Sequence, residues 1–385
     1  MSISNKNLSA GQAPPINVDA IEKELTSLWQ QSSQDEENGG VTRASMLNLL
    51  VYVPSRTQAS QLDDMLTEIT AARPCRAILI VADHDTTEET LTAEVTSRCT
   101  LPSASSKQVC CEQVTITAGG TRIDEVPSAV APLLLSDLPV YLWWHAEPRL
   151  SDKAMFSRLV DLSDRMVIDS TRFREPEADV ADMAAVLTET PRWTAISDLN
   201  WARLTAWRAL LAGFYDIADY RPLLNQLKRV TIRYAPSATN PAVIPARALL
   251  VGGWLASRLH WSVQPGTAKR TTSSTILDFA VDGNSFSLEF AHTRRKIDPG
   301  HLTLVTLEGG ADHPVAFRVR RSADGQRIET SVTRAEVKSS QRVLSYEGLS
   351  ETELIGKELE ILGHDRIYEQ TVLAAGEIIK AIGHS

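Results

Sequence analysis

The stretch Leu138–Trp144 (LPVYLWW) limits the folds open to this chain more than any other part of the sequence. Its apolar and aromatic residues run on without alternation until His145, which indicates a strand covered on both faces. Neighbouring strand residues point to opposite faces, so Trp143 and Trp144 can each pack against a different layer. The run predicts a central strand of an open α/β sheet, with its carboxyl end at His145, where such sheets usually bind ligands. The alternative is that both Trp side chains are only core.

The pattern through residue 190 predicts an α/β domain. Met46–Val53 and Arg76–Ala82 are expected as buried strands joined through a helix at Gln58–Ala72, and such short connections favour a parallel sheet. We therefore expect a Rossmann-like layer over 41–190, preceded over 1–40 by a disordered leader and a helix. Further expected elements are a strand pair at 92–98 and 108–117, helices at 18–31, 122–135, 153–162 and 177–188, and a strand at 165–169.

The pattern over 191–385 predicts a different class, an α+β domain with an antiparallel sheet. Long helices are expected at 197–215 and 240–259, and two helices close the chain at 352–362 and 366–382. Between them the hydrophobic period is two, with glycine-containing turns, which is typical of an antiparallel meander. The expected strands are 228–234, 276–281, 285–292, 302–307, 315–321 and 327–332.

Length and charge restrict the classes of function. A chain of 385 residues is long for one core, which favours two domains. The net charge of −9 argues against nucleic acid and anionic membranes as main partners. No apolar run reaches the roughly 18 residues of a membrane span, and Met1–Pro15 lacks the apolar core of a signal peptide. We expect a cytoplasmic protein.

All four cysteines, Cys75, Cys99, Cys110 and Cys111, lie in the first third of the chain, and none forms a C-x-x-C motif. In a reducing compartment they are expected to be free thiols, some of them buried. Cys110 and Cys111 would face opposite ways in a strand, which argues against a disulfide between them.

The sequence lacks the common motifs of cofactor binding and catalysis. No glycine follows the strand ending at Val53, where a dinucleotide-binding turn would need one, and there is no Walker loop, G-x-S-x-G or H-E-x-x-H motif. Asp83-His84-Asp85 could bind a metal at a strand end, although a solvated turn explains it as well. The sequence therefore predicts no cofactor, no metal and no enzymatic activity.

Two basic clusters remain, Arg294-Arg295-Lys296 and Arg318–Arg321. They could grip a phosphorylated ligand or an acidic surface, or they could be a solvated sheet face. They support the alternative function, a sugar-phosphate-binding enzyme or sensor.

The segment Ser197–Arg208 (SDLNWARLTAWR) has the densest group of specific side chains. Asp198 is a candidate helix N-cap that could also pair with Arg203, and Trp with Arg is enriched at binding hot spots. The alternative is that Trp207 is core and Trp201 half buried. The candidate partner-binding residues are Trp143, Trp144, His145, Asp198, Asn200, Trp201, Arg203 and Arg208.

Three runs taken together, DLPVYLWW (137–144), RMVIDS (165–170) and DLNWARLTAWR (198–208), closely resemble the OpcA family of glucose-6-phosphate dehydrogenase assembly proteins in order and spacing. The clear resemblance covers about 41–220.

The resemblance implies a non-catalytic allosteric activator of glucose-6-phosphate dehydrogenase. Such a protein favours the enzyme's active oligomer and raises its affinity for glucose 6-phosphate in the oxidative pentose phosphate pathway. In the cyanobacterial branch, the resemblance also implies thioredoxin as a partner acting on cysteines near the C-terminus. This chain departs from that pattern, because its last cysteine is Cys111.

Overall fold

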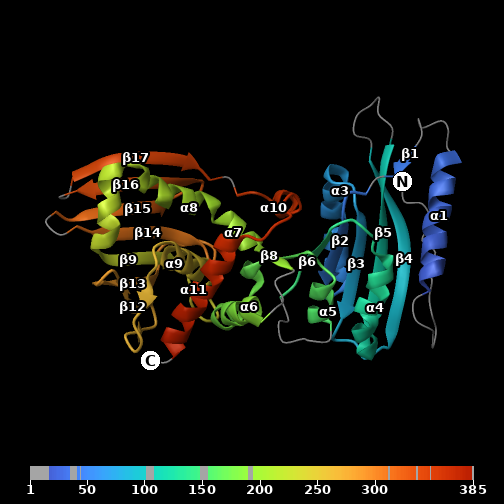
Figure 1. Ribbon diagram of the computed structural model, residues 1–385, viewed down its shortest axis with the longest axis horizontal. Coiled ribbons are helices and arrows are strands. Elements are labelled where there is room, and N and C mark those ends of the chain that lie inside the picture. The colour runs from blue at the N-terminus through green and yellow to red at the C-terminus, as the bar shows by residue number, and fades with distance from the viewer. Residues whose placement is uncertain are drawn as a thin grey trace. The chain divides into compact units, whose positions relative to one another are not determined.

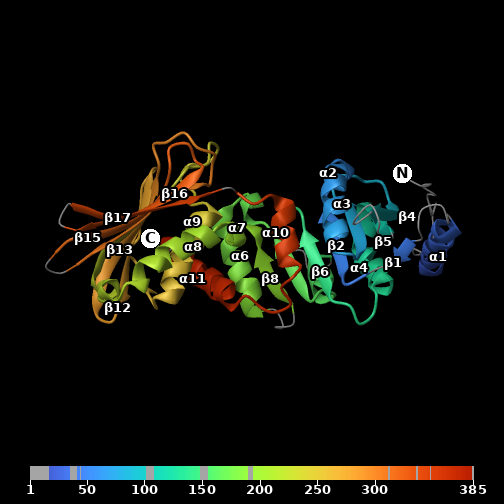
Figure 2. The ribbon, with the colours of Figure 1, turned by 90° about the horizontal axis from the view of Figure 1, so that it is seen from above.

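The computed structural model describes residues 17–34, 41–43, 45–100, 108–147, 155–189, 194–310, 313–334, 337–346 and 348–383. The expected leader before residue 17 and the whole of the loop 101–107 predicted between two strands lie outside these ranges. The chain forms two compact units, each assembled from separated segments (Figures 1 and 2). The first contains 1–169, 191–197 and 350–364, and the second contains 170–190, 198–349 and 365–385. The proposal that 41–190 and 191–385 are separate domains stays a prediction.

The first unit is built on an eight-stranded, mostly parallel sheet, which confirms the α/β class. The spatial order is β1-β5-β3-β2-β6-β7-β8, and β4 pairs antiparallel with β5. Without β1 and β4 the order is 3-2-1-4-5-6, that of the doubly wound dinucleotide-binding fold. The strands are β1 (Val41–Arg43), β2 (Asn48–Val53), β3 (Arg76–Asp83), β4 (Thr90–Thr100), β5 (Gln108–Gly119), β6 (Val140–Trp144), β7 (Arg165–Ile168) and β8 (Ala195–Asp198).

Continuous apolar runs place β2, β3 and β6 at the centre of this sheet, and every residue of β2 and β6 is buried. The helix predicted at 58–72 is two helices that meet at Leu62. The helix predicted at 122–135 is broken into short α and 3₁₀ turns, which Pro127 and Pro132 explain. The helices of this unit are α1 (Val18–Gln34), α2 (Arg56–Gln61), α3 (Asp63–Ala72), α4 (Val126–Val130), α5 (Phe156–Asp161) and α10 (Glu351–Glu358).

The cysteine prediction was wrong for one pair. Cys99 and Cys110 are paired residues of β4 and β5, with their Cα atoms 4.0 Å apart, and they form a disulfide. Cys111 faces away from that bond and its thiol donates to the carbonyl of Thr70, while Cys75 is also free and buried. The spacing of the cysteines in the sequence does not predict this disulfide, because the register of two strands brings the two residues together.

The second unit is built on a nine-stranded sheet in the order β10-β12-β13-β9-β14-β15-β16-β17, with β11 beside β12. The predicted antiparallel meander is interrupted, since β9 lies between β13 and β14 and runs parallel to β13. The strands are β9 (Leu227–Tyr234), β10 (Ser262–Val263), β11 (Lys269–Arg270), β12 (Ser274–Val281), β13 (Asn284–His292), β14 (Leu302–Gly309), β15 (Val315–Arg321), β16 (Arg327–Arg334) and β17 (Val337–Ser345).

The helices of the second unit gather on one face of this sheet (Figure 2). The helix predicted at 240–259 begins only at Ala246, after Pro245, and the one predicted at 197–215 is two short helices preceded by β8. The helices are α6 (Pro176–Glu189), α7 (Leu199–Arg203), α8 (Thr205–Ala212), α9 (Ala246–Arg258) and α11 (Arg366–Gly383), with a 3₁₀ segment at Ala218–Gln226.

Two consecutive glycines let α9 fit between the sheet and α11. A Cβ on Gly252 would lie 2.8 Å from Phe290 of β13, and a Cβ on Gly253 would lie 2.3 Å from the carbonyl oxygen of Thr371 in α11. Both distances are too short for atoms in contact, so a side chain at either position would force the layers apart. The Gly-Gly pair therefore serves packing.

We expect Gly253→Ala to lower the free energy of unfolding by about 1–3 kcal/mol, because the added methyl group overpacks the contact between α9 and α11. Gly356→Ala is the matched control, since nothing lies within 4 Å of that position in α10 and alanine favours a helix. Urea unfolding followed by circular dichroism measures both variants. Equal stability of the two would contradict this packing role.

A buried ion pair ties β3 to β5 in the first unit. The guanidinium of Arg76 donates from Nε to Glu112 Oε2 at 2.7 Å, and its Nη1 donates to Glu22 of α1 and to the carbonyl of Leu133. The side chains of Arg76 and Glu112 are only 2% and 1% exposed. Neither charge can be left without its partner at low cost.

Glu112→Ala is expected to reduce the free energy of unfolding by about 3 kcal/mol or more, because it leaves Arg76 buried without its main counter-charge. Glu125→Ala, which breaks the more exposed pair with Arg122, should cost no more than about 1 kcal/mol. Chemical denaturation of the two variants side by side would refute the account if their losses were alike.

Candidate functional site

The carboxyl edge of the first sheet is where the doubly wound order predicts a ligand, between β2 and β6. Side chains fill this position. The rings of Tyr52 and Trp144 stack with centroids 3.8 Å apart, and the hydroxyl of Tyr52 shares a hydrogen bond of 3.1 Å with Nε2 of His84. Trp144 Nε1 donates to the carbonyl of Glu147 at 3.1 Å. The arrangement closes the edge with aromatic packing.

Trp143 and His145 are also buried at this edge. Their rings meet edge to face at 5.0 Å, and His145 Nε2 lies 3.4 Å from Glu351 Oε1 at the start of α10. Of the predicted site residues, the structure thus brings Trp143, Trp144 and His145 together as part of the core. Their contact with a partner stays a prediction.

The turn after β2 differs from a phosphate-binding turn. It reads Pro54-Ser55-Arg56, and the Ser55 side chain accepts the backbone N–H of Gln58 as the N-cap of α2. A dinucleotide-binding turn instead presents glycine backbone and free helix N–H groups to the pyrophosphate. Here the chain itself satisfies one of those groups.

Two of the three sequence motifs meet in a buried polar cluster of the second unit. Asp198 Oδ1 accepts the backbone N–H groups of Ser170 at 2.9 Å and Asn200 at 2.8 Å, which confirms Asp198 as an N-cap. Asn200 Nδ2 donates to Ser170 Oγ at 2.9 Å, and its Oδ1 accepts from Arg247 Nε at 2.8 Å. The cluster fixes the backbone at both motifs.

Trp201 is buried and not an exposed anchor in this structure. Its Nε1 donates to Asp365 Oδ2 at 2.9 Å, and the guanidinium of Arg208 lies 3.4 Å from the ring centroid. Burial lowers the pKa of Arg208 to about 10. Arg203 is half buried, and its carbonyl accepts from the hydroxyl of Tyr346. The expected pairing of Asp198 with Arg203 stays a prediction.

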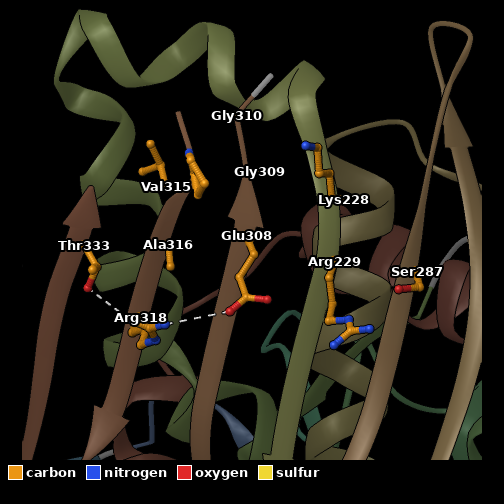
Figure 3. Close-up of a pocket in the computed structure, with 11 residues that line it drawn as sticks. Lys228, Arg229, Ser287, Glu308, Gly309, Gly310, Val315, Ala316, Arg318 and Thr333 are labelled. Carbon is orange, nitrogen blue, oxygen red and sulfur yellow. Dashed lines mark hydrogen bonds and ion pairs between the residues drawn. The ribbon is translucent and has the colours of Figure 1, made fainter. Parts of the chain in front are cut away.

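A pocket of about 490 Å³ opens on the second sheet (Figure 3). Its charged lining residues are Lys228 and Arg229 of β9, Glu308 of β14 and Arg318 of β15. Arg318 Nη1 donates to Thr333 Oγ1 at 2.9 Å, and its Nη2 lies 3.7 Å from Glu308 Oε1. The remaining residues that line the pocket are Ser287, Gly309, Gly310, Pro314, Val315, Ala316 and Thr333.

The two predicted basic clusters lie side by side, because Arg295 of the first contacts the backbone at the end of the second. Arg295 donates to the carbonyls of Arg321 and Ser322, and Arg320 pairs with Glu329 at 2.6 Å, so much of this charge is used within the fold. Of these clusters only Arg318 lines the pocket. Sequence reasoning missed Lys228 and Arg229, although two consecutive cations in a strand that otherwise alternates were a usable signal.

Asp83-His84-Asp85 forms a turn in which Asp83 Oδ1 accepts the backbone N–H of Asp85. Within the described residues, no three His, Cys, Asp or Glu side chains gather in a way that could hold a metal ion. Among the helices that the structure describes, none has both the length and the apolar character of a membrane span.

Solved structures with a partial likeness were found across most of the chain. A mutant of Gal80p from Saccharomyces cerevisiae is 8% identical with a TM-score of 0.47, and covers 88% of this chain and 96% of its own. The WlbA dehydrogenase from Thermus thermophilus is 10% identical with a TM-score of 0.43, covering 88% and 96%. These TM-scores are too low to establish a common fold by themselves.

Three curated relatives have higher sequence identity to this chain than these solved structures have. A Synechocystis protein named OxPP cycle protein OpcA is 23% identical over 95% of this chain and 94% of its own length. A protein of the same name from Nostoc punctiforme is 27% identical over 68% and 70%, and one from Synechococcus elongatus is 32% identical over 55% and 46%.

Two family models match consecutive parts of the chain and together span most of it. Residues 66–185 match the glucose-6-phosphate dehydrogenase subunit N-terminal domain, and residues 194–372 match the corresponding C-terminal domain. Both models are OpcA models, in agreement with the resemblance carried by the three sequence motifs. The chain therefore belongs to the OpcA family of glucose-6-phosphate dehydrogenase assembly proteins.

Proposed function

We propose that this protein is a non-catalytic allosteric activator and assembly factor that binds glucose-6-phosphate dehydrogenase. It favours the active oligomer of the enzyme and raises its affinity for glucose 6-phosphate, in the oxidative pentose phosphate pathway. The observation that carries the proposal is the match of both parts of the chain to domains of a glucose-6-phosphate dehydrogenase subunit. Because its target is a metabolic enzyme, the proposal places it in the cytoplasm.

The first sheet supports a binding role over a catalytic one. At the position where the doubly wound order would hold a coenzyme, Tyr52 and Trp144 stack on each other, and Ser55 caps the following helix. A protein that acts by binding needs no reacting groups there. It needs only to bind the active state of its target more tightly than the inactive state.

The energy required is small. A tenfold gain in the apparent affinity of the enzyme for its substrate corresponds to about 1.4 kcal/mol of coupling between the two binding events. A modest difference between two docked states supplies this amount. The coupling is reciprocal, so substrate should in turn tighten the complex.

Six of the eight candidate partner-binding residues are buried, namely Trp143, Trp144, His145, Asp198, Asn200 and Trp201. We propose that they act on binding through the backbone they hold, and that Arg203 and Arg208, which are half buried, are the members able to reach a partner. A thiol switch near the C-terminus is not part of the proposal, because no cysteine follows Cys111.

Titrating the purified protein into its cognate glucose-6-phosphate dehydrogenase should lower the apparent KM for glucose 6-phosphate until the effect saturates, by about tenfold for the coupling above. Initial rates of NADPH formation measure it, with serum albumin at the same concentrations as the control. An unchanged KM at saturating protein would reject the proposal.

Trp201→Phe should lower the free energy of unfolding by about 1–3 kcal/mol, because Asp365 loses its buried indole donor. The dissociation constant for the dehydrogenase should stay within about twofold, since phenylalanine keeps an aromatic ring against Arg208 and Tyr368 and leaves the backbone in place. Thermal melts and biolayer interferometry measure the two quantities. Weaker binding by a variant of normal stability would instead make Trp201 a direct contact.

Trp254→Phe is the matched control, because Trp254 is half buried and its indole nitrogen has no hydrogen-bond partner within the described part of the chain. Its stability loss should be the smaller of the two.

A further inference from the structure

The nine-stranded sheet has one face covered by helices and an outer face without them in the described residues (Figure 2). On β9 the outer face presents Arg229, Thr231 and Arg233, because strand side chains alternate between faces. The pocket in Figure 3 lies on this face, at the end of the sheet near Gly309 and Gly310. Its volume is within the range that small ligands occupy.

The pocket contains unused positive charge. Lys228 and Arg229 are exposed, and within the described residues neither side chain has a hydrogen bond or an ion pair. With Arg318 they set three cations against the single carboxylate of Glu308. The chain as a whole carries −9, so this local excess of positive charge is opposite in sign to the protein's net charge.

Glu308 of β14 lies between two of these cations, Arg229 of β9 and Arg318 of β15. Glu308 is paired across the sheet with Arg229 of β9 on one side and Ala316 of β15 on the other. Its carboxylate lies 3.7 Å from Arg318, which is longer than a direct hydrogen bond, and both side chains are partly exposed. A loose contact of this kind is readily exchanged for a stronger anion.

A β-bulge at the start of β9 shapes the pocket. The pairing passes from Glu308 with Arg229 to Gly309 with Leu227, so Lys228 is the extra residue of β9. A Cβ on Gly309 would lie 2.5 Å from the carbonyl oxygen of Gln226. Gly310 has a φ of 95° and would also clash with His313. Bulges re-aim side chains at binding sites, and this one ends the ladder beside Lys228.

We propose that this pocket binds a small phosphomonoester, with the phosphate held by Lys228 and Arg229 and approached by Arg318 when the Glu308 carboxylate moves aside. A phosphate dianion matches the donors of a guanidinium and an ammonium group. The hydroxyls of Ser287 and Thr333 line the same pocket and offer hydrogen bonds to the organic part of the ligand. The site goes beyond the proposed function and involves no dehydrogenase.

Isothermal titration calorimetry of the isolated full chain tests the proposal with glucose 6-phosphate, inorganic phosphate and glucose. Glucose 6-phosphate should bind saturably and more tightly than inorganic phosphate, and glucose should give no signal. No saturable binding of glucose 6-phosphate would overturn the proposal, and so would equal affinity for inorganic phosphate. Neither outcome bears on activation of the dehydrogenase.

Three variants locate the site. Arg229→Ala should weaken binding of glucose 6-phosphate at least tenfold. Arg233 is exposed four residues further along β9, on the same face but outside the pocket, and Arg233→Ala should change binding less than twofold. If both variants weakened binding equally, the effect would come from the net charge of the protein and not from this pocket, and the proposed site would be wrong.

Glu308→Gln should act in the opposite direction and strengthen binding about threefold or more, because it removes the carboxylate that competes for Arg318. Weaker binding by this variant would contradict the proposal. Circular dichroism melts confirm that the three variants keep the fold, as expected for partly or fully exposed side chains.

Discussion

The buried guanidinium of Arg165 ties together three stretches of chain that are far apart in sequence. It starts β7, donates to Ser197 Oγ and to the carbonyl of Gly363, and lies 3.6 Å from Glu358 Oε2 of α10. A charge buried to this degree is tolerated only with such partners. Segment 350–364 is thereby held in the first unit, although most of the neighbouring sequence belongs to the second.

Because Arg165 holds segment 350–364 in the first unit, helix α10 can pack on the first sheet. In a doubly wound fold the helix between β7 and β8 would lie on the sheet, but α6 belongs to the second unit. Helix α10 contributes cover in the first unit, where Arg73 donates to the carbonyl of Gly356 and Tyr141 to that of Ile361. Within the motifs at 165–170 and 197–201 lie two of the points where the chain passes from one unit to the other. Their buried polar residues therefore serve the fold first, which is compatible with a binding protein.

The sequence was sufficient for features that depend on local pattern. Continuous apolar runs identified β2, β3 and β6, and Asp198 was recognisable as an N-cap from its residue type and position. Features that depend on which segments become neighbours were not predictable. A period of two tells which face a residue occupies, not which strand lies beside it, so the insertion of β9 between β13 and β14 was missed.

The same limit applies to the candidate sites. The disulfide of Cys99 with Cys110 follows from strand register, and the pocket beside Lys228 and Arg229 lies at the bulge in β9. Trp201 looked like a surface anchor because Trp and Arg are enriched at binding sites, but Asp365 and Arg208 hold it within the fold. Residue type alone cannot separate these two uses of tryptophan.

The central claim is that the protein works by binding glucose-6-phosphate dehydrogenase. Sedimentation velocity on the two purified proteins, alone and mixed, tests it most directly. The account predicts a faster-sedimenting species that contains both chains in a fixed ratio, and more of it when glucose 6-phosphate is present. Two components that sediment in the mixture as they do alone, at micromolar concentrations of each, would contradict it.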